Sequence, residues 1–361
     1  MSAPPGGYRE ALEGVALIDR SARRRLRMSG RAPTQMLQGI VTNRVPPPLE
    51  PVEPGVWSGR APYAAVLTPK GRPVTDLRVL RRGTDEEHGL LLDLPAEGAD
   101  AAAAHFAHYV PPRMARFEDV SETTGHLTLV GPGAAALAAR VALGLRVDTA
   151  ALEGLAEGEL RFVGEPGGDG IWVVASADVA APALDLLSDR ATIVALRGRL
   201  ESAGATPLSP EAWTVLRLEA GRPAYGVDFD EDVRPPEAGI VERAVDHGKG
   251  CYTGQEVIVR IRDRGRVNRH LRGLVLGDGK PAAPGTELWA EGRDRAVGAL
   301  TSAAFSPRAG AVLGLGYVRR EVEVGGEVRV GAPDGDAARV RAAGPGWWEG
   351  ARPSEGGAEG S

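Results

Sequence analysis

Short apolar runs, separated by glycine and proline, divide the first 220 residues of the chain into alternating strands and helices. Runs rich in Val, Leu and Ile predict strands at 15–19, 63–68, 74–80, 89–94, 126–130, 161–164 and 171–176. Segments with apolar residues at helical spacing predict helices at 8–12, 31–37, 99–109, 134–143, 177–187, 189–203 and 210–219. This mixture is typical of α+β sheets that carry helices on one face.

The pattern changes near residue 271, where helical spacing disappears. Short β-like segments separated by Gly, Pro and Asp occur at 271–276, 287–290, 296–302, 313–318 and 327–330. Their even spacing predicts a small all-β barrel or jelly roll. After Pro345 only Trp347 and Trp348 offer apolar surface, so we expect residues 345–361 to form a disordered tail.

Composition limits the class of protein. A length of 361 residues suits two or three domains, and no apolar run reaches the roughly 18 residues that a membrane span needs. Residues 1–10 lack the basic and apolar regions of a signal peptide, and a single cysteine forms no internal disulfide, so we expect a cytoplasmic protein. The net charge of −5 argues against general nucleic-acid binding. Histidine spacing predicts no metal site, and no nucleotide-binding motif is present.

The segment 245–262, with the sequence VDHGKGCYTGQEVIVRIR, holds the clearest candidate chemistry. Its glycines allow tight turns, and a helix beginning near Gly254 would place Cys251 close to a helix N-terminus. That position, together with Lys249, would stabilise a thiolate. A lone cysteine is more often a small buried residue. The clustering of the only cysteine with one of three lysines and one of three glutamines nevertheless favours a functional role.

Upstream, residues 216–226 read as a helix end that carries Glu219 and runs into a loop stopped by glycine. A glutamate there is usually solvated or ion-paired. Its carboxylate can also accept two hydrogen bonds from the amino-pyrimidine edge of a ligand.

Three runs of the chain together resemble a known family. They are 217–226, 235–239 and the Lys-Gly-Cys-Tyr-Thr-Gly-Gln-Glu motif at 249–256, with further similarity at 37–43, 71–77 and 297–302. The chain is similar to the aminomethyltransferase (glycine-cleavage T-protein) superfamily. The motif itself resembles one branch, the folate-binding iron–sulfur cluster maintenance proteins of the YgfZ type, because true T-proteins typically lack this cysteine.

The resemblance implies an architecture and a cofactor. It implies two interleaved folate-binding α+β subdomains over residues 1–266, arranged around a central channel that holds tetrahydrofolate. A C-terminal β-barrel would follow over residues 267–344. No metal is expected to be bound by this chain alone.

The resemblance also implies roles for single residues, each matched to a position of the family pattern. Glu219 matches the glutamate that recognises the pterin ring, and Tyr225 an aromatic residue near it. The other matched folate-binding positions are Asp76, Asn43 and Arg217, and the candidate catalytic residues are Cys251, Lys249 and Asp76. The matched motif residues are Lys249, Gly250, Cys251, Tyr252, Gly254, Gln255 and Glu256. Thr75 and Arg44 stand where T-proteins often have acidic residues, which departs from strict T-protein chemistry.

Three functions are compatible with these features. The leading hypothesis is a tetrahydrofolate-binding protein that supports assembly or repair of iron–sulfur clusters in client enzymes, tRNA-modifying ones among them. One cysteine cannot hold such a cluster, so client or assembly proteins would supply the other ligands. The alternatives are a folate-dependent aminomethyltransferase or demethylase that acts on a small amine, and a folate-sensing adaptor without catalysis. The arginines within 260–272 are read as a solvated face, with an RNA-binding patch as the alternative.

Overall fold

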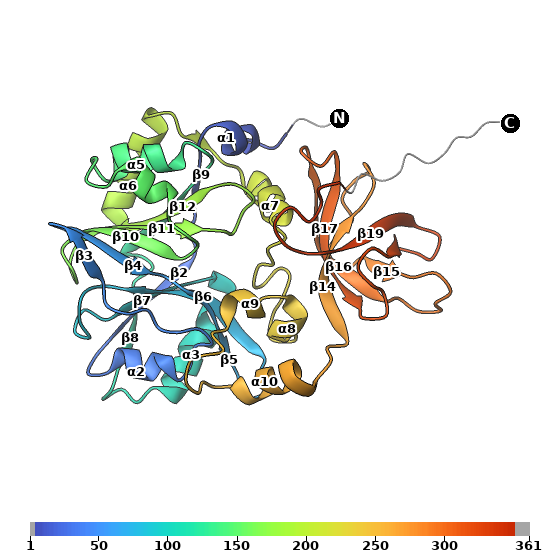
Figure 1. Ribbon diagram of the computed structural model, residues 1–361, viewed down its shortest axis with the longest axis horizontal. Coiled ribbons are helices and arrows are strands. Elements are labelled where there is room, and N and C mark those ends of the chain that lie inside the picture. The colour runs from blue at the N-terminus through green and yellow to red at the C-terminus, as the bar shows by residue number, and fades with distance from the viewer. Residues whose placement is uncertain (1–3, 351–361) are drawn as a thin grey trace.

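Two β-sheets face each other in the N-terminal two thirds of the protein, and a barrel follows (Figure 1). The structure, a computed structural model, describes residues 4–350. The eight-stranded sheet has the order β13(Thr206–Pro207), β1(Ala16–Asp19), β9(Thr124–Val130), β12(Ala183–Asp189), β11(Gly170–Ser176), β10(Glu159–Gly164), β4(Val56–Arg60) and β3(Glu50–Glu53). The five-stranded sheet has the order β5(Tyr63–Leu67), β6(Pro73–Arg81), β7(Leu90–Leu94), β2(Arg24–Ser29) and β8(Arg116–Asp119).

The chain interleaves the two sheets. It passes through β1, crosses to β2, returns for β3 and β4, fills β5 to β8, and then completes the eight-stranded sheet from β9 onward. Neither sheet can therefore be completed by one continuous stretch of sequence. The interleaved α+β architecture expected from the resemblance is confirmed.

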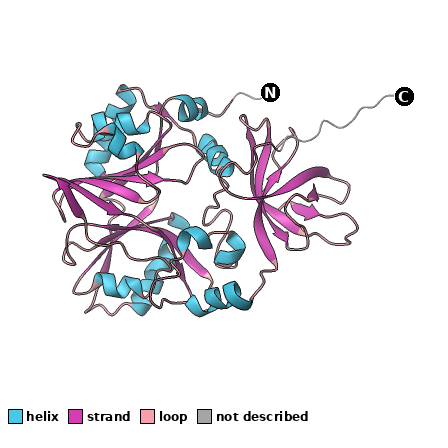
Figure 2. Ribbon diagram, viewed as in Figure 1, coloured by secondary structure: helices cyan, strands magenta, loops and turns pink. Residues whose placement is uncertain are grey.

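Helices cover the outer face of each sheet (Figure 2). The eight-stranded sheet carries α4(Ala134–Leu137), a π-helical turn at Ala138–Ala142, α5(Thr149–Glu153) and α6(Arg190–Ser202), with α1(Tyr8–Glu13) beside β1. The five-stranded sheet carries α2(Pro33–Gln38) and α3(Ala99–Tyr109), the latter preceded by a 3₁₀ turn at Ala96–Gly98. Asp189 caps α6 by accepting a hydrogen bond from the Thr192 amide at 2.9 Å, which fixes where this helix begins.

The inner faces of the sheets pack on each other through large apolar side chains. Leu80 and Leu91 of the five-stranded sheet join Phe162, Trp172 and Leu187 of the eight-stranded sheet in one buried cluster. Burial of each such side chain contributes about 1.5–3 kcal/mol. This inter-sheet core fixes the spacing between the sheets.

One predicted helix is wrong. The segment 177–187 contains no helix, and its second half belongs to β12, which lies between β9 and β11. Leu184, Leu186 and Leu187 are buried because both faces of this central strand are covered. A strand that is apolar on both faces shows no alternation, so a short run does not distinguish it from a helix.

The C-terminal strands close into a six-stranded barrel, as predicted. Its order is β14(Arg269–Val275), β17(Ala311–Arg319), β16(Gly298–Ser306), β15(Glu287–Trp289), β18(Glu327–Val330) and β19(Asp336–Ala342), and the sequence analysis missed only β19. Leu274, Leu300 and Val340 are among the side chains that fill its interior. A closed barrel leaves no unpaired sheet edge.

A helical segment joins the sheets to the barrel. It contains α7(Pro210–Glu219), α8(Pro235–Ala238), α9(Val241–Ala244) and α10(Gln255–Arg264), which lie between the two parts in Figure 1. Leu218 and Tyr252 of this segment pack with Leu315 and Tyr317 of the barrel. Among residues 4–350, no helix has both the length and the apolar character needed to cross a bilayer.

The predicted tail is partly ordered against this segment. Trp347 is buried, and its indole Nε1 donates to the Leu218 carbonyl at 2.8 Å. Trp348 donates to the Glu219 carbonyl at 3.1 Å, so both rings cap the end of α7. A Cβ atom on Gly273 would lie 2.4 Å from the Trp347 ring, which requires glycine there. Residues 351–361 of the predicted tail lie outside the described part of the chain.

Buried charges also join the two sheets. Arg78 of β6 forms an ion pair with Asp185 of β12 and donates to the Ser176 hydroxyl at 3.0 Å. Asp185 also accepts from the Thr128 hydroxyl at 2.6 Å and lies 3.0 Å from His126 Nε2. Burial alone would raise the pKa of Asp185, but His126, Arg78 and Arg20 outweigh it and hold that pKa well below its usual range.

Replacing Asp185 with Asn should lower the free energy of unfolding by about 3–5 kcal/mol at pH 7, because Arg78 then stays buried without its anion. Since the folded-state pKa of Asp185 is depressed, its contribution is fully present above the unfolded carboxyl pKa of about 4 and is lost only below it. Urea unfolding at pH 5 and pH 7 should therefore give the same difference from the wild type. The exposed Asp336→Asn serves as control, and an equal effect of both variants would contradict the prediction.

Candidate functional site

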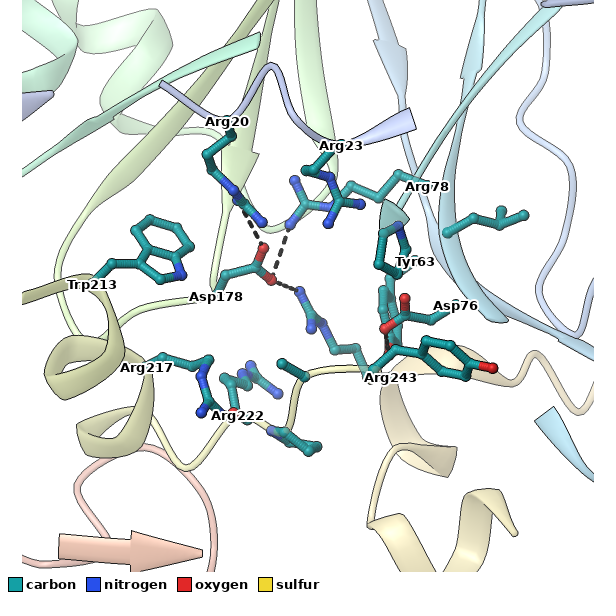
Figure 3. Close-up of a pocket in the computed structure, with 15 residues that line it drawn as sticks. Arg20, Arg23, Tyr63, Asp76, Arg78, Asp178, Trp213, Arg217, Arg222 and Arg243 are labelled. Carbon is teal, nitrogen blue, oxygen red and sulfur yellow. Dashed lines mark hydrogen bonds and ion pairs between the residues drawn. The ribbon is translucent and has the colours of Figure 1, made fainter. Parts of the chain in front are cut away.

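A polar cavity lies where the two sheets meet the helical segment (Figure 3). We call it the central cavity, and it has a volume of about 100 Å³. Its walls come from the loop after β1, from β5 and β6, from the loop after β11, from α7 with its following loop, and from α9. The lining residues are Arg20, Arg23, Tyr63, Asp76, Leu77, Arg78, Pro95, Asp178, Trp213, Arg217, Arg222, Pro223, Ala224, Tyr225 and Arg243.

A second cavity, which we call the side cavity, adjoins the first and measures about 310 Å³. Asn43, Glu157 and Glu242 contribute to its walls. The two cavities share Tyr63, Arg78 and Arg243. The Arg243 guanidinium lies 4.2 Å from the centroid of the Tyr63 ring, so this stacked pair forms part of the partition between the cavities.

Asp178 organises the arginines of the central cavity. Its carboxylate accepts from Arg243 at 2.6 Å, from Arg20 at 3.3 Å and from Arg78 at 3.3 Å, as the dashed lines in Figure 3 show. Burial would raise the pKa of Asp178, but Arg78, Arg243 and Arg20 lower it well below its usual range. Asp178 therefore stays ionised and fixes three guanidinium groups toward the cavity.

The pKa of Asp76 is shifted in the opposite direction from that of Asp178. The Tyr63 hydroxyl donates to its Oδ2 at 2.8 Å, and the side chain is almost fully buried. Burial is the main cause that raises the pKa of Asp76, and the nearby Asp178 adds to the shift against the opposing charge of Arg23. The cavity thus contains two carboxyl groups whose pKa values are pushed apart, which is a common arrangement in acid–base sites.

Aromatic rings complete the lining. Arg20 lies 4.4 Å from the centroid of Trp213, and Tyr225 donates its hydroxyl to the Val74 carbonyl at 2.7 Å. Flat rings and guanidinium planes suit a planar ligand, whereas the remaining arginines suit its carboxylates.

Four residues predicted from the sequence line these cavities. Asp76, Tyr225 and Arg217 lie in the central cavity, and Asn43 lies in the side cavity. The Asn43 amide nitrogen donates to the Tyr63 carbonyl at 2.9 Å and to the Arg243 carbonyl at 3.4 Å. Asn43 therefore holds the backbones of both residues of the partition.

Glu219, expected at the pterin ring, lies outside the lining of both cavities. Its carboxylate is fully buried and accepts from the Tyr8 hydroxyl at 2.5 Å and the Ser306 hydroxyl at 2.7 Å. Arg308 lies 3.0 Å from its other oxygen. These contacts tie α7 to α1 and to the barrel.

Lys249 is buried against main-chain carbonyls. Its ammonium donates to the carbonyls of Gln38, Val41 and Asn43 at 2.8, 2.5 and 2.9 Å. An ammonium group has three N–H donors, so none remains for the Cys251 thiolate. We call this arrangement the lysine clamp. It fastens the motif loop to the segment that ends at Asn43, and burial lowers the pKa of Lys249 to about 8.

Cys251 is exposed and lies in the loop before α10, outside both cavity linings. The neighbouring Tyr252 is buried. Gly254 has a φ of 84°, and a Cβ atom there would lie 2.6 Å from the Thr68 carbonyl oxygen, so the motif requires glycine at this turn. Gly250 is exposed beside Cys251, and Gln255 begins α10.

Much of the arginine-rich run forms ion pairs. Arg260 pairs with Glu256 at 2.6 Å, Arg262 with Asp263 at 2.6 Å and Arg269 with Glu237 at 2.8 Å. Such pairs are typical of the solvated face that the sequence analysis favoured over a nucleic-acid patch.

The groups that dominate the central cavity cannot be predicted from the sequence pattern. They are Asp178, Arg243, Arg20 and Trp213. They come from separate loops and helices, so no spacing in the sequence connects them. Among the described residues, no group of three or more His, Cys, Asp or Glu side chains is arranged to hold a metal ion.

Comparison with known proteins covers nearly the whole chain. The GCVT N-terminal domain family matches residues 7–249, and the glycine cleavage T-protein C-terminal barrel domain matches residues 269–345. An aminomethyltransferase of Rubrobacter xylanophilus is 34% identical over 274 residues, covering 75% of this chain and 69% of that protein. One from Moorella thermoacetica is 32% identical over 283 residues, covering 75% and 72%.

A solved structure shows the same fold. The glycine cleavage system aminomethyltransferase T of Bartonella henselae superimposes with a TM-score of 0.77 at 20% identity. The alignment covers 94% of this chain and 88% of that one.

The lysine clamp gives a stability prediction. Lys249→Met keeps the apolar stem but leaves three carbonyl oxygens without their donor, so the free energy of unfolding should fall by about 2–4 kcal/mol. Urea unfolding at pH 7 measures this change. Lys280→Met, at an exposed lysine, should change the value by less than about 0.5 kcal/mol. Equal stability of the two variants would rule out a structural clamp.

Proposed function

We propose that this chain, which belongs to the glycine cleavage T-protein family, binds tetrahydrofolate in the central cavity and takes a one-carbon unit from a small amine. Aminomethyltransferases of this family use tetrahydrofolate. The observation that carries the proposal is the Asp76–Tyr63 pair, a carboxyl group of raised pKa set among fixed guanidinium groups and aromatic rings.

The residue types that line the cavity match the chemical groups of the cofactor. Folate is a flat ring system that ends in a dicarboxylate, and the lining offers Trp213 and Tyr225 for the rings. Arg20, Arg222 and Arg243 would hold the carboxylates through the N–H groups that Asp178, Glu157 and the Ala177 carbonyl leave free. When bound, tetrahydrofolate supplies the nitrogen atoms that accept the one-carbon unit.

The residues of the chain supply binding and proton control. Because Asp178 stays ionised, it keeps Arg20, Arg78 and Arg243 oriented whether or not a ligand is present. Asp76 takes up a proton more readily than an ordinary carboxylate, and the hydrogen bond from Tyr63 fixes its orientation. Asp76 can therefore act as the general acid or base when the amine donor departs. The side cavity, which shares the Tyr63–Arg243 partition, offers a route for the amine.

Tetrahydrofolate binding tests the first half of this proposal. Titration calorimetry should show saturable binding by the wild type, with at least about a tenfold loss in Arg243→Met, because a charged hydrogen bond contributes roughly 1.5–3 kcal/mol. Cys251→Ala should bind as the wild type does, since Cys251 lies outside both cavities. Circular dichroism of each variant would confirm folding. No saturable binding by the wild type would refute the folate proposal.

A second candidate function rests on the exposed Cys251 in the motif loop. Catalysis in the central cavity gives this thiol no role. It could support the assembly or repair of iron–sulfur clusters in a client enzyme, including tRNA-modifying ones, with the client supplying the other ligands. This function would use tetrahydrofolate binding and thiol chemistry at separate places on the molecule.

Two variants separate these candidates. Transfer of the one-carbon unit from the aminomethyl adduct of a small thiol to tetrahydrofolate releases ammonia and the free thiol, with no net oxidation or reduction. The rate of ammonia release should fall about 10²–10⁴-fold in Asp76→Asn, the usual contribution of a general acid–base residue, and should be unchanged in Cys251→Ala. If the wild type releases no ammonia but restores a [4Fe–4S] enzyme only when Cys251 is present, the second candidate replaces the first.

A further inference from the structure

The largest of the described clefts has no part in the proposed function. It lies between the barrel and the α8 region, measures about 570 Å³, and shares no lining residue with the central or side cavity. We call it the barrel cleft. Its walls include Arg234 before α8, Arg269 of β14 and Arg319 at the end of β17.

Positive charge exceeds negative charge in this cleft. Glu237 accepts from Arg269 at 2.8 Å and lies 3.6 Å from Arg234, so one carboxylate serves two guanidinium groups. The only other acidic lining residue, Asp232, is paired with Arg72 at 2.6 Å. Arg319 is exposed and has no ion pair within residues 4–350. The cleft therefore holds guanidinium charge that an anion would neutralise.

A buried hydroxyl in the same wall also lacks a partner. Tyr317 is only 7% exposed, and its hydroxyl makes no hydrogen bond with any other described residue. Arg269 lies 4.8 Å from the centroid of its ring. Burial raises the pKa of Tyr317, so the hydroxyl keeps its proton and can donate. Leaving such a donor unpaired is unfavourable, and a ligand acceptor would remove that cost.

We propose that the barrel cleft binds a small molecule with a phosphate or carboxylate group, which Arg269 and Arg319 contact while the Tyr317 hydroxyl donates to it. Guanidinium groups suit both oxyanions because their paired N–H groups match two oxygen atoms. The site is separate from the proposed folate site, because the two cavities share no lining residue.

Asp228 nevertheless connects the barrel cleft to the central cavity through hydrogen bonds. Thr301 in the cleft wall donates to Asp228 Oδ1 at 2.6 Å, and Arg217 in the central cavity donates to Asp228 Oδ2 at 2.5 Å. An anion that moves Thr301 in the cleft wall would therefore be linked, through the hydrogen bonds of Asp228, to Arg217 in the wall of the central cavity.

Titration calorimetry with pyrophosphate and, separately, with succinate tests the proposal in low salt without folate. At least one probe should bind the wild type saturably, and the probe that binds identifies the phosphate or the carboxylate source. Arg319→Ala should weaken binding at least tenfold, and Tyr317→Phe, which removes only the hydroxyl, several-fold. Arg320→Ala is the matched control, since this neighbouring exposed arginine does not line the cleft.

Three results would overturn the assignment. The first is the absence of saturable binding for both probes. The second is an equal loss in Arg319→Ala and Arg320→Ala, which would mean diffuse attraction to surface charge. The third is binding that Arg222→Ala abolishes and Arg319→Ala leaves intact, because the anion would then occupy the central cavity. Every variant is assayed by anion binding in the absence of folate. The result can therefore be interpreted even if the protein does not bind tetrahydrofolate.

Discussion

The ion pairs that Arg78 makes across the two sheets determine the rest of the structure. This guanidinium belongs to the five-stranded sheet, but its partners Asp185 and Asp178 belong to the eight-stranded sheet and to the loop after β11. A buried charge is tolerated only when its partner is held in place, so this pairing favours one register of the sheets, whose spacing the inter-sheet apolar cluster sets.

The same constraint creates the central cavity. Asp178 is shared among arginines from three separate segments, and their side chains hold open a polar space that apolar packing would fill. The cost of burying these charges is lowered because Asp178 is paired with arginines, whereas Asp76 takes up a proton more readily than usual. The stability of the fold and the raised pKa of Asp76 therefore depend on the same set of buried charges. Most substitutions of these charges would change both properties.

Helices and strands were predicted correctly from the sequence where one face of the element is exposed to solvent. Amphipathic helices such as Arg190–Ser202 and the evenly spaced barrel strands follow the expected periodicities, and the resemblance supplied the interleaved connection. The pattern failed where burial is complete, as in Ala183–Asp189. It also did not show that β2 contains the fully buried Arg25, because arginine normally marks an exposed position.

The candidate site shows the same limit. A motif places Asp76, Tyr225 and Asn43 near the cavities because their local sequence is distinctive. The role of Lys249 depends on three main-chain carbonyls more than 200 residues away, and that of Glu219 on contacts with both ends of the chain. Main-chain acceptors have no sequence signature, so such anchors become visible only in three dimensions.

The Trp347 indole has a consequence for the order in which the molecule forms during synthesis. The two sheets are complete in sequence before residue 210, so they can assemble while the chain is still being made. Two carbonyls at the end of α7 gain their tryptophan donors later, because Trp347 and Trp348 lie about 130 residues further along the chain. In the nascent chain the two sheets can therefore form before the end of α7 receives the hydrogen bonds from Trp347 and Trp348.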